Sequence, residues 1–83
     1  MAYFMDVHKH MKGVTKDQLK AAHDQDLANE KGTGVHFIRA WGDPKSGHVF
    51  CLSEGPNRDA VTKVHKRSGH PADEIYEVPV IVE

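Results

Sequence analysis

Glycine and proline interrupt this chain at short intervals, and that spacing limits the possible folds more than any other feature of the sequence. The 83 residues include seven glycines and four prolines, and all of these except Pro79 fall between segments of clear strand or helix character. No apolar run is long enough to form a transmembrane helix. A chain of this length is expected to form a single domain over residues 1–83, with a correspondingly small core.

Four segments are predicted to be β-strands, because aromatic and β-branched residues crowd together in them. They are Tyr3–Lys9, Val35–Trp41, His48–Ser53 and Glu74–Val82. Residues 42–47, which are rich in turn-forming residues, separate the second strand from the third and predict a hairpin. Pro79 lies in the last segment and favours an edge position for it, since proline within a sheet is tolerated mainly at an edge.

Two helices are predicted from their capping residues. Thr15 and Gln18 have the spacing of a capping box, which predicts a helix from Thr15 to about Lys31. A second helix is predicted over Arg58–Ser68, with Asn57 as its N-cap. Glycine follows both segments, where it commonly ends a helix.

The resulting order βαββαβ predicts a ferredoxin-like α+β fold, with a four-stranded antiparallel sheet and two helices on one face. Right-handed crossovers would place the first and third strands in the centre of the sheet. Within the first strand, Phe4, Asp6 and His8 are expected to face the same side, and in the second strand Phe37 and Trp41 should share a face. Both sheet faces would be partly apolar, so the face without helices is expected to form a homodimer interface.

Composition excludes several classes of partner. Eleven basic and twelve acidic residues are interspersed and form no basic stripe for nucleic acid. The N-terminal residues lack the pattern of a signal peptide, which predicts a cytoplasmic protein without a membrane partner. The single Cys51 excludes an intramolecular disulfide and suits a reducing compartment. We interpret it as a buried structural thiol.

Histidine is the unusual component, with seven in 83 residues. Asp6, His8 and His10 alternate along the first strand and would share a face if the strand continued that far. One carboxylate and two imidazoles suit a first-row divalent metal. An Asp–His hydrogen bond at a strand end, without a metal, is the open alternative.

Each predicted helix carries a histidine near its apolar stripe. His23 is spaced with Leu19 and Leu27 on the first helix, and His65 follows Val61 by one turn on the second. The second helix should run back toward the end of the first strand, which brings His65 and His70 toward His8 and His10. Half-buried histidines bonded across the helix pair remain the alternative reading.

Several segments resemble one family of small bacterial domains that includes a nickel-binding protein. They are MDVH, AAHDQDL, GHVFCLSEGP, AVTKVH and PADEIYEV, which together span nearly the whole chain. The resemblance implies a ferredoxin-like homodimer that binds nickel for sequestration, without an established catalytic activity. Positions that recur in the family match Asp6, His8, His23 and His65. The chain departs from the family pattern after His65, since the next histidine is His70 rather than residue 69.

The sequence therefore predicts a divalent-metal-binding protein rather than an enzyme, with nickel or another first-row ion as its ligand. The candidate metal ligands are Asp6, His8, His10, His23, His65 and His70. Two alternatives remain open. One is a dimeric α/β-barrel-type enzyme or small-ligand-binding protein that uses this cluster for acid–base chemistry. The other is a structural or regulatory dimer whose histidines respond to pH.

Overall fold

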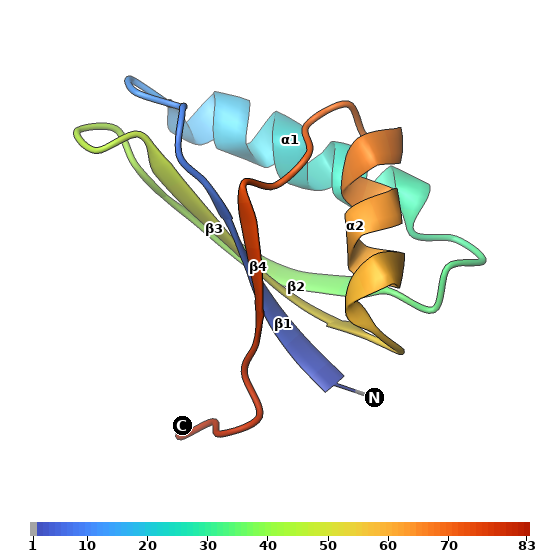
Figure 1. The fold of residues 1–83 in the computed structure, drawn as a ribbon. Coiled ribbons are helices and arrows are strands. Elements are labelled where there is room, and N and C mark those ends of the chain that lie inside the picture. Colours follow the sequence, from blue (N-terminus) through green and yellow to red (C-terminus); the bar gives the residue numbers. More distant parts are fainter. Residues whose placement is uncertain (1) are drawn as a thin grey trace.

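The computed structural model describes residues 2–83 and confirms the predicted ferredoxin-like βαββαβ order (Figure 1). The elements are β1 (Ala2–His8), α1 (Lys16–Asn29), β2 (His36–Asp43), β3 (His48–Gly55), α2 (Arg58–Arg67) and β4 (Glu74–Glu77). The antiparallel sheet has the order β2-β3-β1-β4, so β1 and β3 are central, as predicted. Both helices lie against the same face of the sheet (Figure 1).

The predicted helix caps are confirmed. The Oγ1 atom of Thr15 accepts a hydrogen bond from the backbone of Gln18 at 3.1 Å, and the Oε1 atom of Gln18 accepts one from the backbone of Thr15 at 3.0 Å. Asn57 caps α2 by accepting from the backbone of Ala60 at 2.9 Å. After α2, Gly69 has a φ of +86°, a left-handed conformation that glycine adopts without strain.

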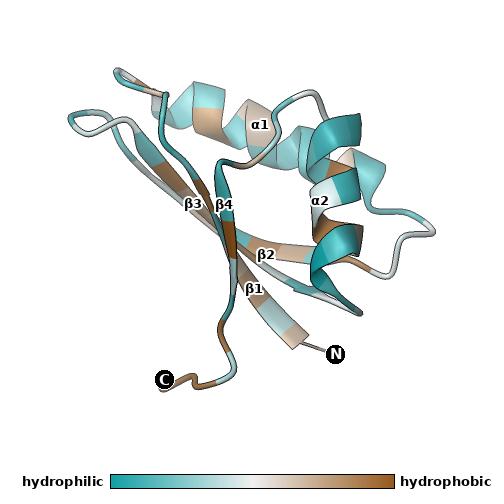
Figure 2. Cartoon of the chain, viewed as in Figure 1, coloured by the Kyte–Doolittle hydropathy of each residue, from teal (hydrophilic) through white to brown (hydrophobic). Residues whose placement is uncertain are grey.

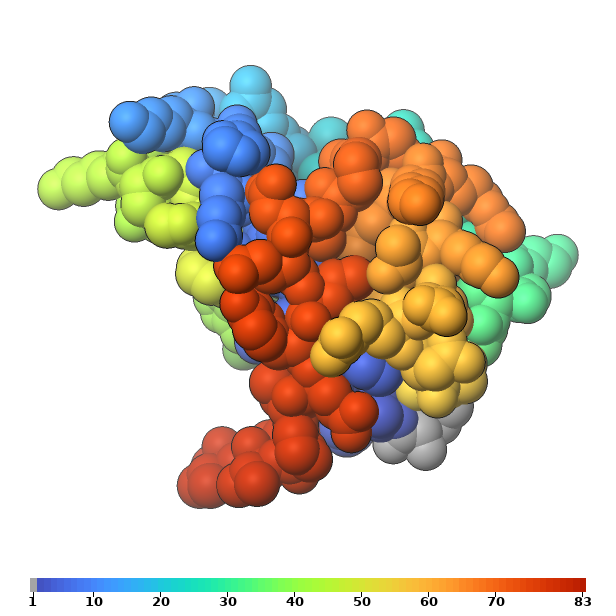
Figure 3. All heavy atoms as spheres, viewed as in Figure 1, coloured from blue at the N-terminus to red at the C-terminus, as the bar shows by residue number. Residues whose placement is uncertain are grey.

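The last strand is shorter than predicted. β4 ends at Glu77, and the backbone N–H of Val78 still donates to the carbonyl of Tyr3 at 2.9 Å. Pro79 has no N–H with which to extend the strand pairing. The predicted edge position of the last strand is confirmed, since β4 forms one edge of the sheet, but Pro79 lies outside the strand and so does not support that prediction. The residues that follow β4 project from the body of the molecule (Figure 3).

A bulge in β2 overturns the prediction that Phe37 and Trp41 share a face. Phe37 pairs with Ser53 and Arg39 with Leu52, so Ile38 is an extra residue on this strand. An inserted residue reverses the alternation of side chains beyond it. Phe37 is consequently buried in the core at 2% exposure, while Trp41 is 41% exposed on the opposite face.

The apolar core lies between the sheet and the helices. Its buried members include Phe4, Phe37 and Val49 from the strands and Val61 and Val64 from α2. Figure 2 shows hydrophobic stretches in the strands, whereas α1 is largely hydrophilic. The layer beneath α1 therefore contains polar side chains as well as apolar ones. No helix among residues 2–83 is long and apolar enough to cross a membrane.

Candidate metal centre

The site begins on β1, where side-chain alternation turns Asp6 and His8 to the same face of the sheet, as predicted, and this face is the one that the helices cover. Asp6 is fully buried and His8 is 6% exposed. Asp6 lies opposite Cys51 of β3 on one side and Ile75 of β4 on the other. A carboxylate in the middle of a sheet therefore has to find its partners among side chains of the helix layer.

His65 of α2 is the main partner of Asp6. Its Nε2 atom lies 2.6 Å from the Oδ2 atom of Asp6, and both side chains are fully buried. The other carboxylate oxygen, Oδ1, lies 3.1 Å from the Nε2 atom of His8. This second contact lacks the alignment of a hydrogen bond, so Oδ1 has no hydrogen-bond partner among the described residues.

Asp26 of α1 completes the cluster, although it is not among the metal ligands predicted from the sequence. Its Oδ1 atom lies 3.3 Å from the Nδ1 atom of His65 and 3.1 Å from the Nε2 atom of His70. The prediction that Leu27 belongs to the inward stripe was wrong, because Leu27 is 37% exposed and Asp26 is 1% exposed. Asp26 follows His23 by three residues, which is the helical spacing that could have identified it.

The fold joins His70 to the cluster despite its shifted position in the sequence. The backbone N–H of His70 donates to the carbonyl of His65 at 3.2 Å, while Gly69 turns the chain through its left-handed conformation. The rings of His8, His65 and His70 then lie with their centroids 5.1–6.0 Å apart. The predicted convergence of these three histidines is therefore present.

The charges in the cluster are strongly coupled. Burial alone would lower the pKa of His65, but the carboxylates of Asp26 and Asp6 outweigh it and raise this pKa to about 9. Burial alone would raise the pKa of Asp6, yet the imidazoles of His65 and His8 hold it below its ordinary value. In the metal-free protein at neutral pH, a positively charged imidazolium thus lies between two carboxylates.

Cys51 and His23 lie at the same centre. Burial, together with the negative charges of Asp6 and Asp26, raises the pKa of the Cys51 thiol above its usual range. His23 is half-buried on α1, and its Nδ1 atom has no hydrogen-bond partner among the described residues. Buried polar atoms are rarely left without a partner, so this nitrogen fits the approach of a cation.

A small, partly open cavity of about 70 Å³ lies beside these side chains. Its polar lining consists of His8, His23, Asp26, Cys51 and His70. Two sets of possible ligand atoms lie within 4.8 Å of one another, namely those of Asp6, His8 and Cys51, and those of Asp26, His65 and His70. The space suits an ion with at most one or two waters, since a water needs about 30 Å³ in the liquid.

His10 is the one predicted ligand that the fold does not bring to the cluster. β1 ends at His8, and the side chain of His10 is 86% exposed, with its Nε2 atom 3.8 Å from the carboxylate of Asp73. The alternation from Asp6 to His10 therefore does not persist.

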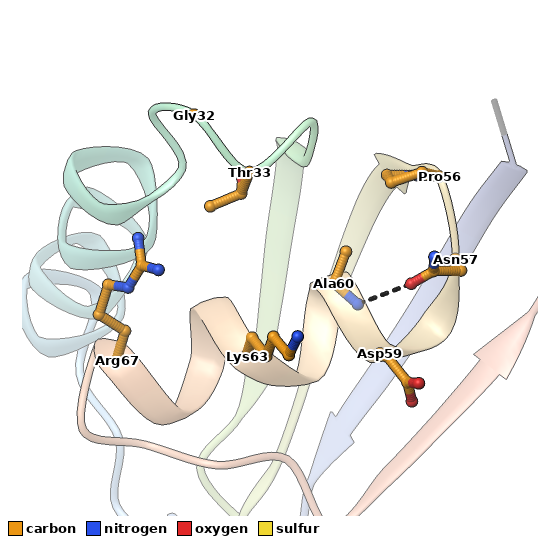
Figure 4. Close-up of a pocket in the computed structure, with 8 residues that line it drawn as sticks. All are labelled: Gly32, Thr33, Pro56, Asn57, Asp59, Ala60, Lys63 and Arg67. Carbon is orange, nitrogen blue, oxygen red and sulfur yellow. Dashed lines mark hydrogen bonds between the residues drawn. The ribbon is translucent and has the colours of Figure 1, made fainter.

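A larger open groove of about 460 Å³ lies between α2 and the loop after α1. Figure 4 shows the side chains of Lys63 and Arg67 on the side of α2 that borders this groove. Its lining contains no histidine or cysteine, so it offers no ligand set comparable with that of the smaller cavity.

Comparison with known proteins finds a matching family model and a similar solved structure. Residues 4–78, which include the whole cluster, match the model of a family described as nickel responsive protein SCO4226-like. The crystal structure of SCO4226 from Streptomyces coelicolor A3(2) is 59% identical in sequence, with a TM-score of 0.95. The match covers 98% of the present chain and 100% of that chain. No curated protein gives a significant match.

Proposed function

Because the chain belongs to the SCO4226-like family of nickel-responsive proteins, we propose that it binds Ni²⁺ at the buried Asp–His cluster and sequesters the ion in the cytosol. One observation carries this proposal. Carboxylate, imidazole and thiol side chains from β1, α1, β3 and the segment after α2 line one small cavity, and the buried Nδ1 atom of His23 lacks a hydrogen-bond partner among the described residues.

The chemistry of the donor set supports a divalent transition metal. Imidazole suits nickel, copper and zinc, and a carboxylate adds a hard oxygen and a negative charge. The ligands that we propose form two groups of neighbouring atoms, one with Asp6 and His8 and the other with Asp26, His65 and His70, and His23 lines the cavity beside them. Affinity order alone would favour copper over nickel, so the choice of nickel rests on the family.

The size of the cavity favours an ion over an organic substrate. Sites for small organic molecules usually enclose about 300–1,000 Å³. The cavity at the cluster has about 70 Å³. This difference supports metal binding over the acid–base enzyme that the same residues could otherwise suggest.

Nickel titration of tag-free protein by calorimetry tests the proposal. We expect His8→Ala to lower the affinity for Ni²⁺ at least ~10-fold, because loss of an outer-shell partner alone typically costs ~10–100-fold. His36→Ala is the matched control, since His36 is exposed and pairs with Glu30 outside the cluster. Equal affinities for the wild type and His8→Ala would contradict nickel binding at the cluster.

We also propose that two copies of the chain associate through the sheet face that the helices leave open. Large apolar side chains are exposed there on neighbouring strands, with Trp41 of β2 directly opposite Phe50 of β3. Tyr76 of β4 adds a third ring, 49% exposed. Contiguous apolar surface of this kind commonly marks an interface. Light scattering should give twice the 9.3 kDa of one chain.

A further inference from the structure

The larger groove beside α2 carries two cations that the fold leaves without a counter-charge. Lys63 and Arg67 lie one turn apart on α2 and line the groove opposite Thr33 of the loop after α1 (Figure 4). Among residues 2–83, neither side chain comes within ion-pair distance of a carboxylate. Like charges one turn apart on a helix repel each other, so an anion that contacts both would relieve this repulsion.

A carboxylate is close in the sequence but does not neutralise this pair. Asp59 precedes Lys63 by four residues, which is the favourable order and spacing for an acid–base pair on a helix. The two side chains nevertheless form no ion pair. Figure 4 shows Arg67 extending toward α1 and the loop that follows it, whereas Asp59 points away from that loop. The end of the groove beside Lys63 and Arg67 is therefore positively charged.

The walls of the groove are held in place by contacts within the chain. The Nη1 atom of Arg67 donates a hydrogen bond to the backbone carbonyl of Asn29 at 3.4 Å, which holds the guanidinium between α2 and the end of α1. Gly34 of the loop lies against Pro56, since a Cβ atom at position 34 would come within 3.4 Å of the proline ring. A site that is already formed loses less conformational entropy when a ligand binds.

We propose that this groove binds a small phosphate monoester whose organic part carries hydroxyl groups. A phosphate monoester has a charge of about −1.5 to −2 at neutral pH, which two cations match better than they match the single charge of a carboxylate. Arginine and lysine are both common partners of phosphate oxygens. The groove has a volume of about 460 Å³, within the ~300–1,000 Å³ typical of small-molecule sites, so it holds more than a phosphate group alone.

The rest of the lining suits the organic part of such a ligand. Pro56 and Ala60 provide apolar carbon atoms. The Oδ1 atom of Asn57 accepts from the backbone of Ala60 at 2.9 Å, so its amide N–H groups are the side that donates to a hydroxyl oxygen. The carboxylate of Asp59, in the same part of the lining, accepts from a hydroxyl group. No residue of the candidate metal centre lines this groove, so the proposal does not depend on nickel binding.

Titration of the isotope-labelled full chain with glycerol phosphate, followed by NMR of the backbone amides, tests the proposal. We expect saturable shifts at Gly32, Thr33 and Lys63, no such shifts with glycerol, and weaker binding of inorganic phosphate. Lys63→Gln should lower the affinity for glycerol phosphate about 10-fold, the size expected for the loss of one hydrogen bond to a charged group. The amide spectrum of each variant also reports whether it folds.

Lys66→Gln is the matched control, because it removes the same charge from the same helix at an exposed position outside the groove. Its affinity for glycerol phosphate should stay close to that of the wild type. Equal weakening by Lys63→Gln and Lys66→Gln would reduce the binding to a general attraction between charges and overturn the site. Shifts confined to other residues, or no saturable shifts at millimolar concentrations, would also overturn it. Equal affinity for inorganic phosphate would overturn the role of the organic part.

Discussion

Asp6 and His65 are 59 residues apart in the sequence, yet their Oδ2 and Nε2 atoms lie 2.6 Å apart in the buried layer between sheet and helices. This contact ties central strand β1 to helix α2. It also contributes to the charge of the candidate metal centre. The carboxylate of Asp26 lies 3.3 Å from the other nitrogen of the His65 ring.

Removal of the Asp6 carboxylate should destabilise the metal-free protein. Asp6→Ala leaves His65 without its closest partner in a fully buried position, and breaking a buried ion pair typically costs about 3–5 kcal/mol. Urea denaturation monitored by circular dichroism measures the loss. Lys20→Ala is the control, because its contact with Asp24 is exposed on both sides and resembles a surface ion pair worth about 0–1 kcal/mol. Similar losses in the two variants would mean that the Asp6–His65 contact contributes little.

The stability of the metal-free protein should depend on pH in a defined direction. The pKa of His65 rises from 6.5 to about 9 on folding, so its contribution is fully present below pH 6.5 and is lost as the pH rises through 9. The pKa of Asp6 falls on folding from 3.8, so its contribution is present above that value and is lost as the pH falls further.

The midpoint of urea denaturation should therefore fall as the pH is raised from about 5 to about 9.5. This range covers the change in the pKa of His65 on folding. His65→Gln removes the titrating group and should flatten this decline. An unchanged slope in that variant would assign the pH dependence to other groups.

Nickel binding should release protons at neutral pH. An imidazole must be neutral to ligate a metal, and His65 keeps its proton to a pH of about 9 in the metal-free protein. Calorimetric titrations in buffers of different ionisation enthalpy count the protons released per ion. We expect at least one proton from the imidazole of His65 at pH ~7.5, with a smaller release in His65→Gln. Equal proton release in the two proteins would exclude coordination by His65.

A charge on the open sheet face should disrupt the proposed dimer. Phe50→Lys places an ammonium group beside Trp41 at the centre of the proposed interface, where burial of an unpaired charge is strongly unfavourable. Light scattering should then report the mass of a single chain. Leu27→Lys is the matched control, because Leu27 has the same 37% exposure but lies on α1. A dimer that tolerates Phe50→Lys would require a different interface.

Local sequence patterns were sufficient to predict most of the fold. The capping box of Thr15 and Gln18 and the alternation of Asp6 and His8 depend on neighbours within a few residues, and both are confirmed. The bulge at Ile38 depends instead on how β2 aligns with β3, and the sequence of β2 alone contains no mark of it.

The candidate site was only partly predictable for the same reason. Asp26 was missed because α1 is polar on most of its surface, so an inward stripe through Leu27 was as reasonable as the true one. A shift of one residue rotates the inward face of a helix by about 100°. Cys51 gained its neighbours only through the pairing of β1 with β3, which brings distant residues together.

The position of the small cavity between the sheet and α1 has a kinetic consequence. Its walls come from the sheet and from α1, including Leu19, Ala22 and Val49. A brief separation of α1 from the sheet would widen the cavity, so the frequency of that local opening would influence how fast a bound ion enters and leaves. The residence time of an ion would then depend on the stability of the contact between α1 and the sheet as well as on the ligands.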